Sequence, residues 1–185
     1  MSAARAGAGA PAQPVILIDT REQAPLAFSH LEAEAATLAT GDYSVKGLED
    51  DFTVERKSMA DLLGSLTHDR ERFFRELQRM RAYSTRLLLV VGTTAELHSL
   101  LARRKISLPS IQGSLAGIEA RGIPVAFYGT PAAAARKVES MAFYAWRQRL
   151  RGLAPVEIPA WAREDMQERM NAAGWTAGQG KGGAI

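Results

Sequence analysis

Charged residues that could bind a metal ion gather in three short stretches of the 185-residue sequence. The first, FTVERKSMADLLGSL at residues 52–66, passes from an apolar run to a helix start, with Glu55 and Lys57 at the junction. The other two contain Asp42, in Gly-Asp-Tyr, and Asp19, in Ile-Asp-Thr-Arg-Glu. Carboxylate oxygens are the hard ligands that Mg²⁺ and Mn²⁺ prefer. We therefore expect the three stretches to meet in space around a divalent metal ion.

This combination of residues suits the hydrolysis of a phosphodiester bond. A metal ion polarises the phosphate and lowers the pKa of a bound water molecule, and a nearby lysine stabilises the negative charge that develops. Alternate residues of a β-strand point to the same side, so Glu55 and Lys57 share one side and Arg56 faces the other. An Asp followed at a distance by Glu-x-Lys is the generic core of restriction-endonuclease-like nucleases, although Glu-x-Lys alone is common in charged segments.

Short strands are expected to position the three stretches. Residues 15–18 are an apolar run, which predicts a buried strand with Asp19 at its carboxyl end, where ligands gather in α/β sheets. Residues 32–38 fit either a helix or a strand, and we favour a strand. Residues 43–57 predict a β-hairpin with a polar turn at 47–51, and antiparallel pairing then brings Asp42 opposite Glu55.

The rest of the sequence predicts alternating helices and strands. Ser58 is a candidate N-cap for a helix that begins at residue 59, and a second helix is expected at 69–84. Further strands are expected at 87–92 and 123–127, and further helices from about 93, at 109–120 and at 131–151, with a basic triplet at 103–105 in a loop. These intervals are typical of right-handed crossover units. The predicted fold class is therefore α/β, with a central mixed β-sheet flanked by helices.

The helix expected at 69–84 carries an apolar stripe and an arginine-rich surface. The stripe contains Phe73, Leu77 and Met80. The candidates for contacts with DNA phosphates are Arg70, Arg72, Arg75 and Arg79. The alternative is a solvated helix face supported by internal pairs such as Glu71–Arg75.

Composition limits the class of protein and its organisation. The net charge of +3 permits a polyanionic partner without requiring one, and the absence of cysteine excludes disulfides, zinc–thiolate sites and a thiol nucleophile. No apolar run is long enough to span a bilayer, and residues 1–14 lack the apolar segment of a signal peptide. We expect a cytoplasmic protein with no membrane partner. Its parts would be a flexible leader at 1–14, one domain at 15–151 and an extension at 152–185 with a short helix and a Gly-rich tail.

The motif around Glu55 extends well beyond Glu-x-Lys. Residues 41–43 are Gly-Asp-Tyr, and residues 55–61 are Glu-Arg-Lys-Ser-Met-Ala-Asp. Together they resemble the Gly-Asp…Glu-Arg-Lys-x-x-x-Asp signature of the XPF-type structure-specific endonucleases. Residues 19–22, Asp-Thr-Arg-Glu, are similar to the first acidic element of that family. The resemblance covers residues 15–150, is specific through residue 91 and is mostly topological beyond it.

The resemblance implies roles for individual residues. It assigns metal binding to Asp19, Asp42, Glu55 and the main-chain carbonyl of Arg56. It assigns catalysis to Asp19, Asp42, Glu55 and Lys57, with the lysine positioning or activating the attacking water. The groups that it places beside the metal ligands or facing phosphate are Arg21, Glu22, Arg56 and Asp61. A competing interpretation makes Asp61 a helix cap and nothing more.

The implied activity is Mg²⁺- or Mn²⁺-dependent cleavage of DNA, with a preference for branched, flapped or forked duplexes, in DNA repair or recombination. Only 33 residues follow Gly152, too few for the tandem helix-hairpin-helix module of many family members, so we expect a compact, stand-alone nuclease domain of bacterial or phage type. Family members pair through this domain, so the implied partners are DNA and a second subunit, identical or different, held through residues 108–121 and 131–151. Two alternatives stay open: an inactive DNA-binding scaffold of the same fold, and a nuclease without structure specificity.

Overall fold

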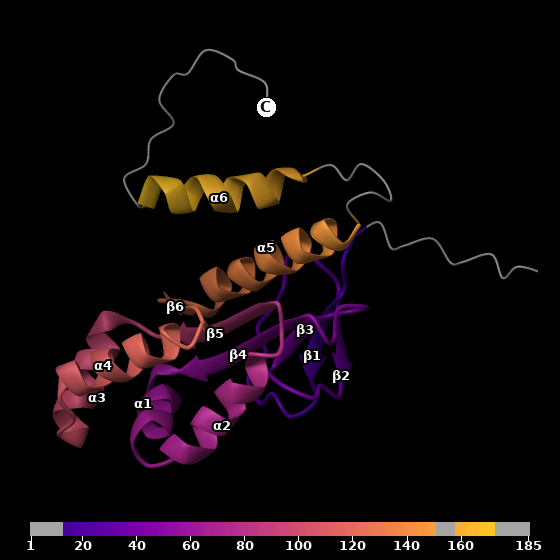
Figure 1. The fold of residues 1–185 in the computed structure, drawn as a ribbon. Coiled ribbons are helices and arrows are strands. Elements are labelled where there is room, and N and C mark those ends of the chain that lie inside the picture. The colour runs from indigo at the N-terminus through magenta and orange to yellow at the C-terminus, as the bar shows by residue number, and fades with distance from the viewer. Residues whose placement is uncertain (1–12, 151–157, 173–185) are drawn as a thin grey trace, which may run out of the picture.

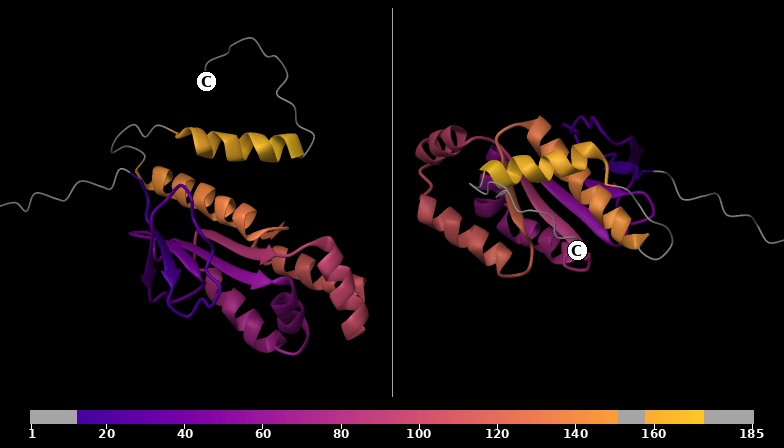
Figure 2. Two further views of the ribbon diagram at one scale, coloured as in Figure 1. Left: turned by 180° about the vertical axis from the view of Figure 1, so that it is seen from behind. Right: turned by 90° about the horizontal axis from the view of Figure 1, so that it is seen from above.

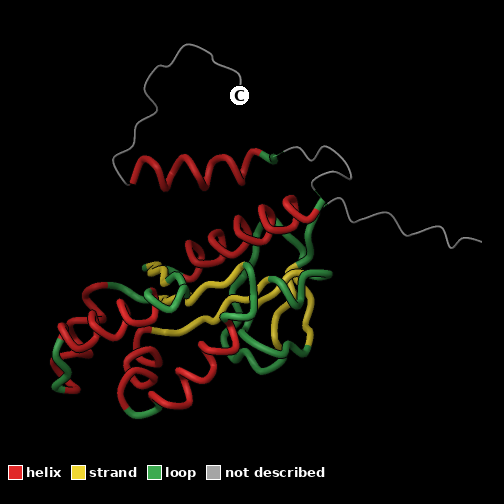
Figure 3. Tube along the Cα trace, in the orientation of Figure 1, coloured by secondary structure: helices red, strands yellow, loops and turns green. Residues whose placement is uncertain are grey.

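A six-stranded β-sheet forms the centre of the molecule, with strand order β2-β1-β3-β4-β5-β6. The structure, a computed structural model, describes residues 13–150 and 158–172. The predicted leader, apart from its last two residues, and the predicted Gly-rich tail therefore lie outside the described residues. Helices cover both faces of the sheet, as Figures 1 and 3 show, which confirms the expected α/β class.

The described elements alternate along the chain much as the sequence predicts. The strands are β1 (Ile16–Asp19), β2 (Ala33–Ala36), β3 (Tyr43–Val45), β4 (Phe52–Ser58), β5 (Thr85–Val91) and β6 (Val125–Tyr128). The helices are α1 (Met59–Thr67), α2 (Arg70–Met80), α3 (Thr94–Arg104), α4 (Leu108–Glu119), α5 (Pro131–Arg149) and α6 (Ala160–Ala172).

The sheet is mixed, as expected. Strand β1 pairs in parallel with β2 and antiparallel with β3, and β3 pairs antiparallel with β4. Strands β4, β5 and β6 run parallel to one another, joined by helical crossovers. The ambiguous segment at 32–38 forms the edge strand β2, which confirms the strand interpretation. It lies at the edge of the sheet, paired on one side only, and its residues are mostly exposed.

Two separate hydrophobic cores lie on the two faces of the sheet. Strand β5 contributes side chains to both cores, because successive residues of a strand point to opposite faces of the sheet. Leu87 and Leu89 belong to the core under α5, and Leu88 and Val90 belong to the core under helices α1 to α4. Helix α6 lies outside α5, as the two views of Figure 2 show. None of the helices described is long and apolar enough to cross a membrane.

Two details of the predicted elements are wrong. Residues 103 and 104 lie in the last turn of α3 instead of a loop, where their positive charges interact favourably with the negative end of the helix dipole. Lys105 then ends the helix in the left-handed conformation, with φ of 55°. Helix α2 ends at Met80, four residues before the predicted end, and the chain turns so that Tyr83 is buried.

Candidate active site

The three charged stretches predicted to meet do lie together. The pairing of Tyr43 with Val54 sets Asp42 opposite Glu55, as the hairpin predicts, and the Asp42 N–H donates to the Val54 carbonyl at 2.8 Å. The N–H of Asp19, at the end of β1, donates to the Asp42 carbonyl at 2.8 Å. Main-chain hydrogen bonds of the sheet therefore fix the spacing of the three acidic residues before any side-chain contact is formed.

An open pocket of about 290 Å³ lies at this convergence. Strands β1 and β4, with the segments after β1 and before β3, form one wall, and α2 forms the other through Arg72, Glu76 and Arg79. The sequence interpretation missed Glu76. Its signal was present, because Glu76 lies four residues after Arg72 and three before Arg79, on the same face of the helix.

In both the Asp42 and the Glu55 carboxylate, one oxygen accepts a hydrogen bond from the part of the chain that the structure describes and the other does not. Asp42 Oδ2 accepts the Arg56 main-chain N–H at 2.7 Å, and Glu55 Oε1 accepts Lys57 Nζ at 2.6 Å. Within the described chain, Asp42 Oδ1 and Glu55 Oε2 accept no hydrogen bond. Burial, and then the negative charge of Glu55, raise the pKa of Asp42 to about 7. The site therefore holds two facing carboxylates, each with one oxygen that accepts no hydrogen bond from the described residues.

Asp19 is in a different state from the other two acids. It is 3% exposed, and it accepts Arg21 Nε at 2.6 Å, Arg21 Nη2 at 3.0 Å and the Leu38 N–H at 2.8 Å. The hydrogen bonds from the Arg21 side chain lower the pKa of Asp19 to about 2, although burial opposes the shift. Among the described residues, no three acidic or histidine side chains are arranged to hold a metal ion. Both oxygens of Asp19 are engaged by Arg21, whereas Asp42 and Glu55 each keep one oxygen without a hydrogen bond within the described ranges.

Lys57 is held as a cation beside these acids. Burial disfavours its charge, but the adjacent Glu55 carboxylate outweighs burial, and the pKa of Lys57 lies above its ordinary value. Its ammonium group also lies 5.6 Å from the centre of the Phe73 ring, in cation–π contact. Lys57 can therefore offer positive charge to a phosphate, and it cannot accept a proton at neutral pH.

Arg56 faces away from the pocket, as the strand alternation predicts. Its guanidinium donates from Nε and Nη2 to the two carboxylate oxygens of Glu22, both at 3.1 Å, and the side chains are 15% and 6% exposed. Neither side chain lines the pocket. Of the two roles implied for Arg56, bracing the acidic cluster fits this geometry and contact with phosphate does not.

Replacement of Glu22 by glutamine tests this brace. We expect it to lower the free energy of unfolding by about 3 kcal/mol, because a buried guanidinium loses its counter-ion. Urea unfolding measures the loss. The matched control is Glu34→Gln, which breaks the exposed pair with Lys46 and should cost less than about 1 kcal/mol. Equal small losses in the two variants would show that the Glu22–Arg56 pair does not brace the site.

Asp61 is a cap residue in this structure. Its N–H donates to Ser58 Oγ at 3.1 Å, and its Oδ2 accepts the Ser58 hydroxyl at 2.6 Å, which confirms the predicted N-cap of α1. The side chain is exposed and does not line the pocket. The geometry therefore favours the capping interpretation over a phosphate contact.

Gly41 permits the close approach that places Asp42. Its φ of +80° is unfavourable for other residues, and a Cβ there would lie 2.2 Å from Thr53 Oγ1 and 2.9 Å from the Val54 carbonyl oxygen. We expect Gly41→Ala to lower the free energy of unfolding by about 3 kcal/mol. Gly47 has the same φ but open space around it, so Gly47→Ala should cost about 1 kcal/mol. Chemical denaturation measures both variants. Equal losses of unfolding free energy in Gly41→Ala and Gly47→Ala would show that the close contact of Gly41 with Thr53 and Val54 does not matter for stability.

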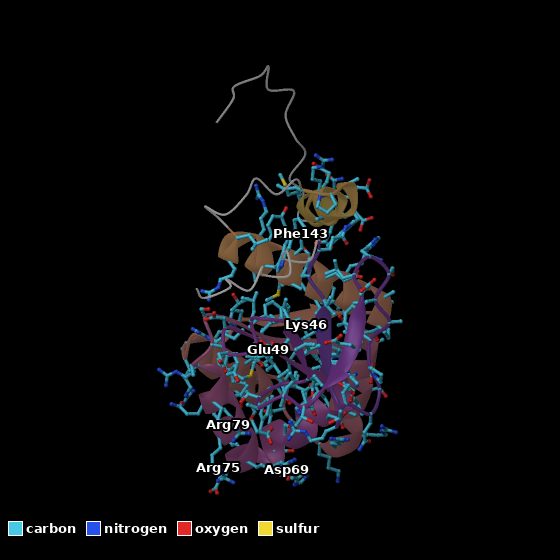
Figure 4. The ribbon with its side chains drawn as sticks, turned by 90° about the vertical axis from the view of Figure 1, so that its right-hand side faces the viewer. Lys46, Glu49, Asp69, Arg75, Arg79 and Phe143 are labelled. Atoms are coloured by element: carbon cyan, nitrogen blue, oxygen red, sulfur yellow. The ribbon has the colours of Figure 1, made fainter. Side chains whose placement is uncertain are left out.

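The four arginines predicted to grip DNA are divided by the structure between two sides of α2. Arg72 and Arg79 line the pocket, whereas Arg75 lines a groove on the other side and Arg70 lies over the Phe74 ring at 4.6 Å. Figure 4 shows Arg75 and Arg79 at the end of the molecule away from Phe143 of α5. Arg72 also lies 3.5 Å from Asp69 and 3.8 Å from Glu76, in exposed pairs of the kind that the alternative interpretation expected.

A mixed sheet with an Asp–hairpin–Glu-x-Lys site defines a protein of the restriction-endonuclease-like nuclease fold. Residues 18–141 match the model of the ERCC4 domain, the XPF-type nuclease domain, and the chain belongs to this family. The resemblance inferred from the motif is therefore confirmed.

Solved structures give the same fold. XPF from Aeropyrum pernix matches with a TM-score of 0.59 and 25% identity, over 79% of this chain and 66% of that one. A second structure, XPF from Aeropyrum pernix in complex with DNA, matches with a TM-score of 0.57 and 22% identity, over 88% of this chain and 84% of that one. The chain thus spans just under two thirds of the first structure's chain. No curated protein sequence gives a significant match.

Proposed function

We propose that the chain is a Mg²⁺- or Mn²⁺-dependent DNA endonuclease. The observation that carries this proposal is the pair of facing carboxylates, Asp42 and Glu55, with one free oxygen each, beside a protonated Lys57. Membership of the ERCC4 family and the DNA complex of a related structure support it. The inactive-scaffold alternative is disfavoured because this chain keeps every acidic residue of the motif.

The donor set fits a hard divalent cation. Mg²⁺ is usually held by one or two carboxylates together with water and substrate phosphate oxygens, and Asp42 Oδ1 and Glu55 Oε2 are the oxygens that would hold it here. A cation between them would favour the ionised form of Asp42, whose pKa is otherwise raised. Asp19 would join as a third ligand only by turning away from Arg21. When bound, such an ion polarises a phosphate oxygen and acidifies a bound water molecule.

The other residues of the pocket bind and orient the substrate. Lys57 directs its ammonium group at the non-bridging phosphate oxygens or at the attacking water, and its charge stabilises the transition state. Arg72 and Arg79, on the opposite wall, contact the phosphates that flank the cut. The water oxygen loses a proton to solvent and attacks phosphorus. The bond to the 3′ oxygen breaks, that oxygen takes a proton from solvent, and the products are a 5′-phosphate and a 3′-hydroxyl.

Preference for branched, flapped or forked DNA, and a role in repair or recombination, follow from the family and form part of the proposal. Pairing with a second nuclease domain is also part of it. Helix α6 packs on α5 through the Phe143 and Trp161 rings, 5.7 Å apart, and so covers part of one predicted pairing helix. Helix α4 is the predicted pairing helix that α6 leaves uncovered, and we add the edge strand β6, whose Phe127 is 46% exposed, as a second candidate for that contact.

Cleavage of end-labelled DNA tests the proposed function. The panel contains single strand, duplex, 5′ flap, 3′ flap, fork and four-way junction of shared sequence, each with Mg²⁺ and with EDTA. We expect Mg²⁺-dependent cutting that is faster on a branched substrate than on plain duplex. Equal rates on all duplex substrates would exclude structure specificity. Binding without any cutting would favour the scaffold.

A further inference from the structure

A second groove lies across α2 from the candidate active site. Its volume is about 400 Å³. Its floor is apolar, formed by Phe74, Leu77 and Ile123, and its rim carries the three guanidiniums of Arg75, Arg81 and Arg121 with a single acid, Glu71. The two hollows therefore share α2 as a common wall but differ in the balance of charge around them.

Arg81 and Arg121 on the rim, and Arg70 beside the groove, have neutral hydrogen-bond partners. The third rim arginine, Arg75, lies 4.0 Å from Glu71 in an exposed ion pair. Arg70 Nη1 donates to Ser114 Oγ at 3.0 Å, Arg81 Nη1 donates to Gln78 Oε1 at 3.1 Å, and Arg121 Nη1 donates to the Gly117 carbonyl. The guanidiniums of Arg70 and Arg121 also lie 4.6 and 5.3 Å from the centre of the Phe74 ring. In the part of the chain that the structure describes, none of Arg70, Arg81 and Arg121 has an acidic partner. Their positive charge is available to a ligand.

Charge is distributed unevenly between the two hollows. The active-site pocket has four acids, Asp19, Asp42, Glu55 and Glu76, and four basic residues, Arg21, Lys57, Arg72 and Arg79, so its charges balance. The groove has three basic residues and one acid, an excess of two positive charges, and Arg70 lies beside it. A polyanion is therefore attracted more strongly to the groove than to the residues that cut it.

We propose that this groove, the Arg121 groove, binds backbone phosphates of the DNA that is cut on the other side of α2. The inference rests on the proposed nuclease function and deepens it by naming a second contact. A helix is about 10–12 Å across with its side chains, and phosphates of one strand follow one another at about 3.4 Å along the duplex axis. The groove therefore holds DNA about three base steps from the bond that is cut.

Salt-dependent DNA binding tests the groove. Binding of a labelled fork is measured by fluorescence anisotropy in EDTA, which keeps the DNA intact, between 50 and 200 mM NaCl. Arg81→Ala and Arg121→Ala should each weaken binding roughly fivefold at the lower salt, and should each reduce the slope of log K against log salt by about 0.9. The matched control is Arg149→Ala, which removes an exposed arginine of α5 on the opposite face of the sheet and should change neither quantity.

Further variants separate loss of charge from loss of structure. Arg121 also donates a hydrogen bond to the Gly117 carbonyl in α4, so Arg121→Ala could perturb that helix. Arg121→Lys keeps the positive charge and should keep most of the DNA affinity. The proposal fails if Arg121→Ala and Arg81→Ala both match Arg149→Ala in affinity and slope while the unmodified chain binds DNA, because nuclease function then stands without the groove. A chain that binds no DNA overturns the groove and the proposed function together.

Discussion

Alanine at Asp42, Glu55 or Lys57 is expected to slow DNA cleavage by about a thousandfold or more while DNA affinity stays within about threefold. The two carboxylate variants would lose the free oxygens that hold the cation, and the lysine variant would lose the half-buried ammonium group of the pocket. Single-turnover cleavage with Mg²⁺ measures the rate, and anisotropy in EDTA measures binding.

Asp61→Ala provides the contrast to these three variants. Because Asp61 bonds to Ser58 at the start of α1 and does not line the pocket, we expect cleavage within about threefold of the unmodified chain and a loss of about 1 kcal/mol in stability. If Glu55→Ala cuts as fast as the unmodified chain, the assignment of the active site is wrong. If Asp61→Ala loses cleavage without losing stability, the residue contacts the substrate.

Without metal, Asp42→Asn is expected to stabilise the protein at pH 8. The folded chain keeps the Asp42 proton until about pH 7, whereas an ordinary aspartate releases it near 3.8. Between these values the folded state binds more protons than the unfolded state, so the free energy of unfolding falls as the pH rises. The fall attributable to Asp42 is on the order of 4 kcal/mol, nearly complete by pH 8, and absent from Asp42→Asn.

Thermal unfolding in EDTA across pH 4 to 8 measures this difference. Asp19 does not contribute to this pH dependence. Its pKa is lowered to about 2, so the stability that it contributes is lost only as the pH falls below about 4. The matched control is Asp50→Asn, in the exposed turn before β4, which should follow the unmodified chain. A parallel pH dependence in Asp42→Asn would mean that burial and the Glu55 charge do not raise the pKa of Asp42.

The sequence predicted the arrangement of the acidic residues because it depends on main-chain pairing. An apolar strand ending at Asp19 and a hairpin with a polar turn fix where Asp42 and Glu55 lie, and the structure confirms both. The strand alternation likewise placed Arg56 on the side away from Lys57. These are consequences of a two-residue period that can be read directly from the chain.

What the sequence did not predict depends on side-chain contacts between distant segments. Glu22 bonds to Arg56, 34 residues away, and Arg21 bonds both to Asp19 and to the Leu38 carbonyl. No periodicity identifies such partners. The separation of Arg75 from Arg72 and Arg79 was missed for another reason: α2 is a shared wall, so its arginines face two hollows. A helical wheel shows one polar surface but does not show what lies on each side of it.

Calorimetric titration with Mn²⁺ tests most directly whether Asp42 and Glu55 form the metal site. The chain contains no cysteine, and the carboxylates of the pocket are the hard ligands in question. The titration is carried out on the unmodified protein, on Asp42→Asn and on the control Asp50→Asn. We predict saturable binding by the unmodified protein and by Asp50→Asn, and its loss in Asp42→Asn. Equal Mn²⁺ binding by Asp42→Asn and the unmodified protein would contradict the proposed site.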